Sequence, residues 1–446
     1  MRFSARMTPP VLPLVLTCLS TAAVLAHGAG EARQSPPGDQ ALTSLLSDAI
    51  DGDQPRALAL LERVVNINSG TMNLAGVRQV GDVFRAELAT LGFMTRWVDG
   101  AAFKRAGHLV AVRPGLGRRV ILVGHLDTVF ELDSPFQKLE KLSATTARGP
   151  GIIDMKGGDV IIVSALKALS AAHLLHRLSI TVVMTGDEED PGEPLDLARK
   201  ALVDAAAGAE VAIGFEDGSG DPRTAIISRR GYTNWELRVT GTPAHSSQVF
   251  TDKVGAGAIY ETARVLHGFY DRLSKESLLS VNPGVALGGT TVDFDAPRSK
   301  GTAFGKSNVV SGAAVVTGDI RAFTPAQLQS AKAAMREVAA ASLPHTASTL
   351  SFDDSYPPMA PSDGHRQLLA MYDQASRDLG LGPVAATDPR AAGAADVSFI
   401  AGIVPQVIDG VGLMGADDHT ERETADLGTL ASQTKRVALL LARLAR

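Results

Sequence analysis

The chain has 446 residues and a formal net charge of −5, with 45% hydrophobic and 20% charged residues. This balance is typical of a globular protein and excludes a disordered or collagen-like chain. The slightly acidic charge and the 5% aromatic content exclude a nucleic-acid surface, which needs a basic stripe or a stacking platform. The length predicts about two or three domains, and we expect a soluble protein that binds a small ligand.

The first 30 residues have the pattern of a secretory signal peptide. Arg2 and Arg6 precede an apolar run at 11–25, and small residues follow it. The run is short and interrupted by polar residues, which favours a cleaved signal over an uncleaved anchor. We therefore expect a secreted or periplasmic protein without membrane contact after cleavage. Cys18, the only cysteine, lies in this segment, so the mature chain is predicted to lack disulfides and cysteine ligands.

After a polar linker at residues 31–40, short apolar runs alternate with amphipathic helices. The predicted strands are 108–112, 119–124, 178–185 and 210–215, and the predicted helices are 80–91, 155–172 and 195–207. Strands that alternate with helices are typical of βαβ units and of a buried, mostly parallel sheet. The sequence therefore predicts an α/β domain that begins at residue 41.

The pattern changes after Asp221. Residues 232–240 alternate with period two, as in a strand with one exposed face. A predicted helix (254–273), two strand-like runs (284–293 and 308–322) and a helix (325–341) follow. This order predicts an antiparallel sheet with helices on one face. The parallel-type pattern resumes near Thr349 and ends in a helix at 432–444. We therefore predict one α/β domain, residues 41–221 and 344–446, interrupted by a smaller α+β domain, residues 222–343.

Polar residues follow several predicted strands, at the edge where an open α/β sheet collects its ligands. They are His125 and Asp127 after the strand at 119–124, Asp154 in a glycine-rich turn, Glu188 and Glu189 in the acidic run 187–190, Glu216 after the strand at 210–215, and His419 near the C-terminus. Each alone has an ordinary explanation, such as a helix cap or a solvated loop. Together they predict a metal site. Two histidines and several carboxylates without cysteine suit Zn²⁺ or Mn²⁺, with Co²⁺ as a substitute.

The chain resembles the zinc metallopeptidases that include glutamate carboxypeptidase, the aminoacylases and succinyl-diaminopimelate desuccinylase, and glutamate carboxypeptidase most of all. The matching motifs are GHLDTVF, GPGIIDMKGG, TGDEED, GFED, TGTPAHSS, SNVVSGAAVVTGDIR and DDHT, in the family's order. The resemblance implies a catalytic α/β domain interrupted by a lid and dimerisation domain. It also implies two zinc ions per chain bridged by Asp154, with His125 and Glu216 at one ion, Glu189 and His419 at the other, and Glu188 as general base.

The spacing of these residues supports their roles. Asp127 follows His125 by two residues in an extended segment, so it is expected on the same side, where it accepts the second ring N–H of the histidine. Glu188 and Glu189 are adjacent and are expected to point in opposite directions, one to the substrate water and one to a metal. The resemblance also implies a cis peptide bond after Asp154.

The α+β domain carries three candidate substrate-binding residues. The resemblance implies that His245 and Asn308 reach the active site of the partner in a homodimer, and that Arg321 holds a substrate carboxylate. The alternatives are a surface histidine and a surface salt bridge. In glutamate carboxypeptidase an arginine after the return to the catalytic domain holds the substrate's terminal carboxylate, but residues 351–361 contain no Arg or Lys. This departure argues against a strict preference for C-terminal glutamate.

The sequence thus predicts a zinc-dependent hydrolase of amide or peptide bonds in small peptides or N-acyl amino acids, first of all a carboxypeptidase-like exopeptidase. An aminoacylase or dipeptidase is the alternative with the same mechanism. A non-catalytic binding protein that retains the fold is the alternative of another class. It would show substitutions among the ligands or the base, and every one of those positions is filled.

Overall fold

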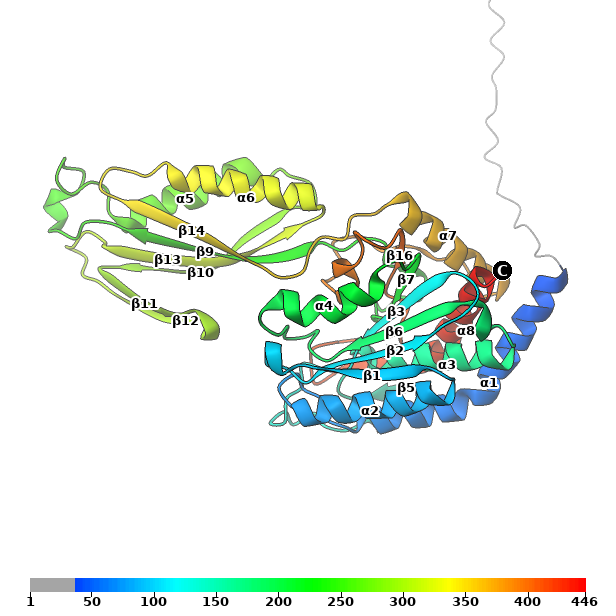
Figure 1. The fold of residues 1–446 in the computed structure, drawn as a ribbon. Coiled ribbons are helices and arrows are strands. Elements are labelled where there is room, and N and C mark those ends of the chain that lie inside the picture. The colour runs from blue at the N-terminus through cyan, green and yellow to red at the C-terminus, as the bar shows by residue number, and fades with distance from the viewer. Residues whose placement is uncertain (1–36) are drawn as a thin grey trace, which may run out of the picture.

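The structure, a computed structural model, describes residues 37–446 and consists of two domains (Figure 1). The predicted signal peptide and residues 31–36 of the predicted linker lie outside the described residues. Helix α1 (Pro37–Val65) begins inside the predicted linker, so residues 37–40 are helical. Proline is favoured in the first helical turn, and Asp39 complements the positive end of the helix. Among the described residues, no helix is long and apolar enough to cross a membrane.

The larger domain is built on a six-stranded sheet in the order β1-β2-β6-β3-β7-β16. Its strands are β1 (Met94–Asp99), β2 (Gly107–Arg113), β3 (Arg119–His125), β6 (Ser179–Thr185), β7 (Val211–Gly214) and β16 (Gln406–Ile408). Strands β6, β3, β7 and β16 are parallel, and β1 and β2 form an antiparallel edge. The prediction of a mostly parallel central sheet is confirmed.

Strand β3 is buried on both faces of this sheet. Val120 and Leu122 belong to the apolar core shared with α1, α3 and α8, whereas Ile121 and Val123 belong to the core on the α4 side. Such a continuous apolar run is what a parallel strand covered on both faces requires. The helices of this domain, besides α1, are α2 (Leu74–Thr90), α3 (Gly157–Ala171), α4 (Leu195–Ala206), α7 (Asp363–Asp378) and α8 (Gly428–Leu444).

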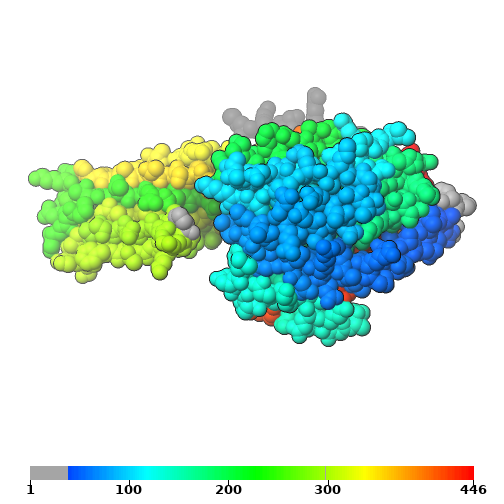
Figure 2. All heavy atoms as spheres, turned by 60° about the horizontal axis from the view of Figure 1, so that its bottom comes forward, coloured from blue at the N-terminus to red at the C-terminus, as the bar shows by residue number. Residues whose placement is uncertain are grey.

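The smaller domain, called the lid below, projects from the larger one as a separate lobe (Figures 1 and 2). Its antiparallel sheet has the order β10-β13-β9-β14, with two helices on one face (Figure 1). The elements are β9 (Gly231–Thr240), α5 (Ala258–Leu273), β10 (Ser280–Gly289), β13 (Ala313–Ala322), α6 (Pro325–Ala340) and β14 (Ala347–Asp354). Trp235 and Leu237 alternate inward on β9 and share a core with Phe269 of α5, as the period-two pattern predicts.

Three predicted boundaries in the lid are wrong. Thr224 and Ala225 pair with residues 385–386, and Ile226 pairs with Asp409, all in the catalytic domain, so the lid begins after these residues rather than at residue 222. Strand β14 pairs with β9 along its whole length, so the lid continues to Asp354 rather than ending at residue 343. As an edge strand with one exposed face, β14 alternates and lacks the apolar run of a catalytic-domain strand. The run predicted as one strand at 284–293 is instead β10 and β11 (Thr291–Asp295), which forms a hairpin with β12 (Lys300–Phe304). The chain turns at Gly289, where a Cβ would lie 2.5 Å from the Phe304 carbonyl oxygen.

A small antiparallel sheet in the order β17-β18-β5-β4 joins segments that are distant in sequence. Its strands are β4 (Glu140–Lys141), β5 (Thr146–Arg148), β17 (Gly415–Ala416) and β18 (Thr424–Asp426). Strand β5 leads into the turn that holds Asp154, and the hairpin between β17 and β18 carries His419. Because β18 pairs with β5, this sheet brings Asp154 and His419 together. A further short parallel pair joins β8 (Thr224–Ala225) to β15 (Ala385–Ala386).

Candidate metal centre

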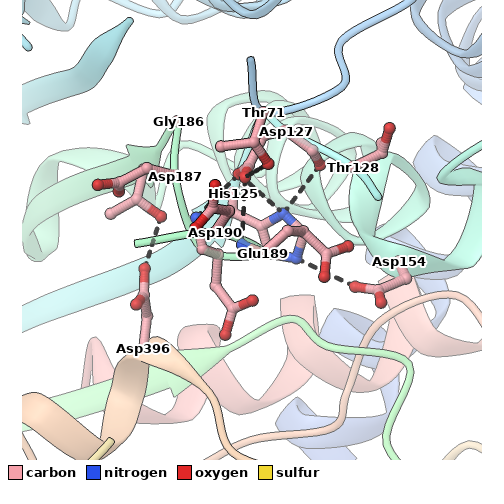
Figure 3. Close-up of polar contacts among 12 residues, drawn as sticks. Thr71, His125, Asp127, Thr128, Asp154, Gly186, Asp187, Glu189, Asp190 and Asp396 are labelled. Carbon is pink, nitrogen blue, oxygen red and sulfur yellow. Dashed lines mark hydrogen bonds and ion pairs between the residues drawn. The ribbon is translucent and has the colours of Figure 1, made fainter. Parts of the chain in front are cut away.

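Asp154 lies between the two predicted histidine ligands. The Nε2 atom of His125, at the end of β3, is 3.0 Å from Oδ1 of Asp154 (Figure 3). The Nε2 atom of His419 is 2.8 Å from Oδ2 of the same carboxylate. One carboxylate oxygen therefore faces each histidine, which is the arrangement expected of a bridging ligand.

The two remaining predicted ligands each lie beside one histidine. Glu216 Oε1 is 3.8 Å from Nε2 of His125, and Glu189 Oε2 is 3.2 Å from Nε2 of His419. The structure therefore brings all five predicted ligands into one cluster, grouped as the resemblance implies. Asp418, which was not predicted from the sequence, is a further candidate ligand, because its carboxylate lies within 4.8 Å of ligand atoms of Asp154 and His419. The adjacent acidic residues of the DDHT motif were the only signal for it in the sequence.

The pKa values of the cluster are shifted because its carboxylates are buried and close to one another. Although burial acts against it, hydrogen bonds from His125 and His419 hold the pKa of Asp154 well below its usual range. Burial, together with the neighbouring Asp154 carboxylate, raises the pKa of Glu189 to about 7. Burial also raises the pKa of Glu216 to about 7. Hydrogen bonds to Asp154 and Glu189 raise the pKa of His419 to about 11.

This donor set fits divalent metal ions. Carboxylate oxygens and imidazole nitrogens are ligands for Zn²⁺ and similar ions, and a buried carboxylate cluster is costly without compensating positive charge. His125, Asp154 and Glu216 converge on one point, since their ligand atoms lie within 4.8 Å of one another. The residues present therefore suit a metal centre at the strand ends.

Glu423 fixes the turn that carries Asp154, and sequence reasoning missed it. Its buried carboxylate accepts main-chain N–H groups of Gly151 at 2.8 Å, of Ile153 at 2.9 Å and of Asp154 at 3.2 Å. Gly151 has φ +68°, and a Cβ there would lie 2.3 Å from the Thr128 side chain, so the turn requires glycine. The peptide bond between Asp154 and Met155 is cis, as the resemblance implies.

Asp127 has a different contact from the expected one. The Nδ1 atom of His125 is 3.1 Å from the main-chain oxygen of Asp127, whereas the carboxylate oxygen is 3.5 Å away. The carboxylate instead accepts the main-chain N–H groups of Glu188 at 3.0 Å and Glu189 at 3.1 Å and the Thr71 hydroxyl at 2.7 Å (Figure 3). Asp127 therefore orients the histidine through its backbone and the two glutamates through its side chain.

Glu188 and Glu189 both line a cavity of 720 Å³ together with Asp154, Glu216 and His419. Glu189 reaches His419, whereas within residues 37–446 no ion pair involves the Glu188 carboxylate. Burial, reinforced by the charge of Glu216, raises the pKa of Glu188 well above its usual range. A carboxyl group that faces a metal site without an ion-pair partner is suited to accept and return a proton.

Of the predicted lid residues, only Arg321 lines this cavity. Its guanidinium lies 4.6 Å from the centre of the Tyr232 ring, and Nε is 3.2 Å from Asp319 Oδ2. Arg321 and Tyr232 also line a second cavity, over the exposed face of the lid sheet, so the two cavities share a boundary. Arg321 therefore faces the cavity of the metal cluster, and its binding of a substrate carboxylate stays a prediction.

His245 and Asn308 lie elsewhere on the lid. The Ser246 N–H donates to the Asn308 carbonyl oxygen at 2.9 Å, and His245 pairs with Val309 in an isolated bridge. Both side chains are exposed. At about 3.3 Å per residue, strand β9 separates them by roughly 30 Å from the end of the sheet that carries Arg321. They are absent from the cavity lining of their own chain, and their action in a partner's site stays a prediction.

The fold and the site together define a metal-binding α/β protein with an inserted lid. The comparisons with known proteins then identify its family. A family model described as Peptidase family M20/M25/M40 matches residues 121–443. The chain therefore belongs to this family of metallopeptidases.

Known relatives cover most of the chain. Carboxypeptidase G2 of Pseudomonas sp. is 24% identical over 405 residues, which is 89% of this chain and 91% of the relative. Aminopeptidase PepT of Bacillus cereus has a TM-score of 0.70 at 18% identity, over 88% of this chain and 99% of PepT. The Bacillus subtilis YXEP protein, described as a dinuclear metal binding peptidase, has a TM-score of 0.60 at 14% identity, over 88% of this chain and 98% of that protein. The two structural likenesses show the fold alone.

Proposed function

We propose that the protein is a zinc-dependent exopeptidase of the carboxypeptidase type that cleaves amide or peptide bonds in small substrates. The observation that carries the proposal is the Asp154 carboxylate between His125 and His419, with Glu188 beside it in the same cavity. When bound, two metal ions supply Lewis acidity that activates a water molecule and polarises the scissile carbonyl group.

The chain's own residues supply the proton transfers and hold the reacting groups. Glu188, whose pKa is raised by burial, takes the proton of the attacking water and delivers it to the leaving amine. Asp127 holds the main-chain N–H groups of Glu188 and Glu189, which fixes the base relative to the ligands. Arg321 binds a carboxylate of the substrate from the lid side of the cavity.

The proposal includes a homodimer formed through the lid, because His245 and Asn308 do not reach the cavity of their own chain. In that dimer they support the developing negative charge at the partner's site. We also propose a secreted or periplasmic location, on the signal-peptide pattern of residues 1–30, and we propose neither a nucleic-acid nor a membrane partner. Co²⁺ or Mn²⁺ is expected to replace Zn²⁺.

An aminoacylase or dipeptidase is the second candidate, and one structural observation favours it. The return stretch at 351–361 contributes Ser351 and Asp353 to the cavity that adjoins Arg321. In that cavity this stretch offers a carboxylate and no cation. A C-terminal glutamate side chain gains no ion pair from these residues, whereas N-acyl amino acids and dipeptides with uncharged side chains need none.

A substrate screen tests the proposal. The mature protein, loaded with zinc, is incubated with matched sets of N-acyl amino acids, dipeptides and N-blocked peptides, and the released amines are measured. Release of C-terminal residues from N-blocked peptides supports the carboxypeptidase, and cleavage confined to N-acyl amino acids or free dipeptides supports the second candidate. Binding without cleavage of any compound in the zinc-loaded protein contradicts both and favours the binding protein.

A further inference from the structure

Two chain segments connect the lid to the catalytic domain, and they are hydrogen-bonded to each other. The Tyr232 N–H donates to the Tyr356 carbonyl oxygen at 2.8 Å, and the Ser355 N–H donates to the Tyr232 carbonyl oxygen at 3.2 Å. Arg229 and Met359 exchange two more main-chain bonds, both of 3.0 Å. Any movement of the lid relative to the catalytic domain therefore acts on this pair of segments, called the hinge ladder below.

The Tyr356 side chain leaves the hinge ladder and enters the catalytic domain. It is only 6% exposed, and its ring centre lies 5.1 Å from that of Phe399. Its hydroxyl donates to the main-chain oxygen of Glu188 at 2.6 Å and accepts from Nη2 of Arg199 at 3.0 Å. A residue of the hinge ladder thus makes a direct hydrogen bond to the backbone of the predicted general base.

Arg199 anchors this contact in the catalytic domain. Its guanidinium is 2% exposed and pairs with Asp187 at 2.7 Å and with Asp396 at 2.8 Å. Asp396 also accepts the hydroxyl of Thr185, at the end of β6, at 2.5 Å. Because a buried guanidinium that forms two ion pairs is costly to move, the Tyr356 hydroxyl has a fixed partner on one side and Glu188 on the other.

Glu188 is therefore held on both sides of its backbone. Asp127 Oδ1 accepts its N–H at 3.0 Å, and Tyr356 donates to its carbonyl oxygen at 2.6 Å. The first bond comes from the metal-bearing strand end, and the second comes from the hinge ladder. The direction of the Glu188 side chain depends on this backbone, so a change at either bond moves the carboxylate relative to the metal cluster.

We propose that Tyr356 is a positioning residue that couples the lid to the general base, so that the state of the hinge ladder sets the placement of Glu188. The proposal rests on the proposed hydrolase function for its kinetic test. Tyr356 itself touches no metal ligand side chain, and its effect is exerted through the Glu188 backbone. Lid closure and base alignment then occur together, which limits proton transfer to the closed site.

The first test is Tyr356→Phe, which removes the hydroxyl and keeps the ring. We expect kcat to fall about tenfold to a hundredfold through misplacement of the base, with KM and metal content little changed. Tyr372→Phe is the matched control, because Tyr372 is 1% exposed and its hydroxyl donates to Oε1 of Gln433 at 3.2 Å, within the contact between α7 and α8. An equal loss of kcat in both variants overturns the proposal, since it reduces Tyr356 to a structural tyrosine.

The second test asks whether the effect runs through the hinge ladder. A Cβ at Gly231 would lie 2.6 Å from the Pro358 ring, so Gly231→Ala forces the two hinge segments apart. We expect it to lower kcat in the wild-type background and to change kcat by less than about twofold once Tyr356→Phe is present. Pro358→Ala, which empties the same contact, is the second hinge variant. In the control background of Tyr372→Phe, the fold-changes in kcat of the two substitutions should multiply. If they also multiply in the Tyr356→Phe background, the proposed coupling is wrong.

A third measurement does not depend on activity. Hydrogen exchange of the peptide that covers residues 186–190 is expected to quicken in Tyr356→Phe, while Tyr372→Phe leaves it at the wild-type rate. Unchanged exchange in this segment overturns the proposal even if no substrate is cleaved. A different result is that the wild-type protein hydrolyses none of the substrates while exchange still quickens in Tyr356→Phe. That result refutes the proposed function but supports the link between Tyr356 and the Glu188 backbone.

Discussion

The Glu423 carboxylate holds the main-chain N–H of Asp154 at 3.2 Å, so the proposed bridging ligand is oriented by a residue more than two hundred positions away in sequence. The other oxygen of the same carboxylate holds Gly151. A glutamine at 423 replaces one acceptor with an amide N–H₂, which faces an N–H donor and repels the turn.

Glu423→Gln should therefore lower the affinity for zinc by about 10- to 100-fold, the usual effect of losing an outer contact that orients a ligand. Competition with a coloured chelator measures this affinity. Glu421→Gln is the control, because Glu421 is exposed and two residues away. Equal zinc affinities in the two variants would show that Glu423 does not act on the metal site.

The metal content itself is a separate prediction. Four ligands around one bridging carboxylate imply close to two zinc ions per chain after reconstitution. His125→Ala and His419→Ala should each empty mainly one position, because they face different oxygens of Asp154. Elemental analysis gives the ratio, and full activity in excess chelator with no bound metal would end the di-metal interpretation.

Matched substitutions should distinguish the role of Glu188 from that of Glu189. Glu188→Gln removes the proton acceptor and leaves the ligand set intact, so kcat should fall about 10²- to 10⁴-fold with unchanged metal content. Glu189→Gln removes the carboxylate at 3.2 Å from His419 and should lose metal. The opposite pattern, with metal lost only from Glu188→Gln, would mean that the two roles are exchanged.

The five predicted ligands could be picked out from the sequence because each of them has a local signal. His125 and Glu216 directly follow apolar strands, and parallel strand ends meet at one edge of a sheet. Glu423, Arg199 and Tyr356 have no such signal, because their importance comes from partners that only the folded chain brings near. Strand β14 was assigned to the wrong domain for a similar reason, since an edge strand is identified by its neighbour and not by its own pattern.

The pH dependence of folding should include a contribution from His108. This side chain is 0% exposed, its Nε2 is 2.8 Å from the Ala198 carbonyl oxygen, and its Nδ1 accepts the Gly186 N–H at 3.2 Å. Burial lowers the pKa of His108 below its usual value of 6.5. The unfolded chain therefore binds this proton first, so the contribution to stability is present above about pH 6.5 and is lost as the pH falls below it.

Urea unfolding at several pH values between about 7.5 and 5 measures this effect. The free energy of unfolding should decrease toward acid pH, and His108→Gln should be less stable at pH 7.5 but show a shallower pH slope. His267→Gln provides the control, because His267 is exposed and pairs only with Asp271, four residues away on α5. An unchanged slope in His108→Gln would assign the acid sensitivity to other groups.

The last prediction concerns the dimer. His245 and Asn308 lie together at the end of the lid away from Arg321, so a single chain lacks them at its own metal cluster. His245→Ala should lower kcat without changing metal content. Mixing His245→Ala with Glu188→Gln subunits then places one intact composite site in each mixed dimer. Random pairing makes half of the dimers mixed with one of two sites working, so activity should recover to about a quarter of wild type. Verified subunit exchange without any recovery would show that His245 serves its own chain or no active site at all.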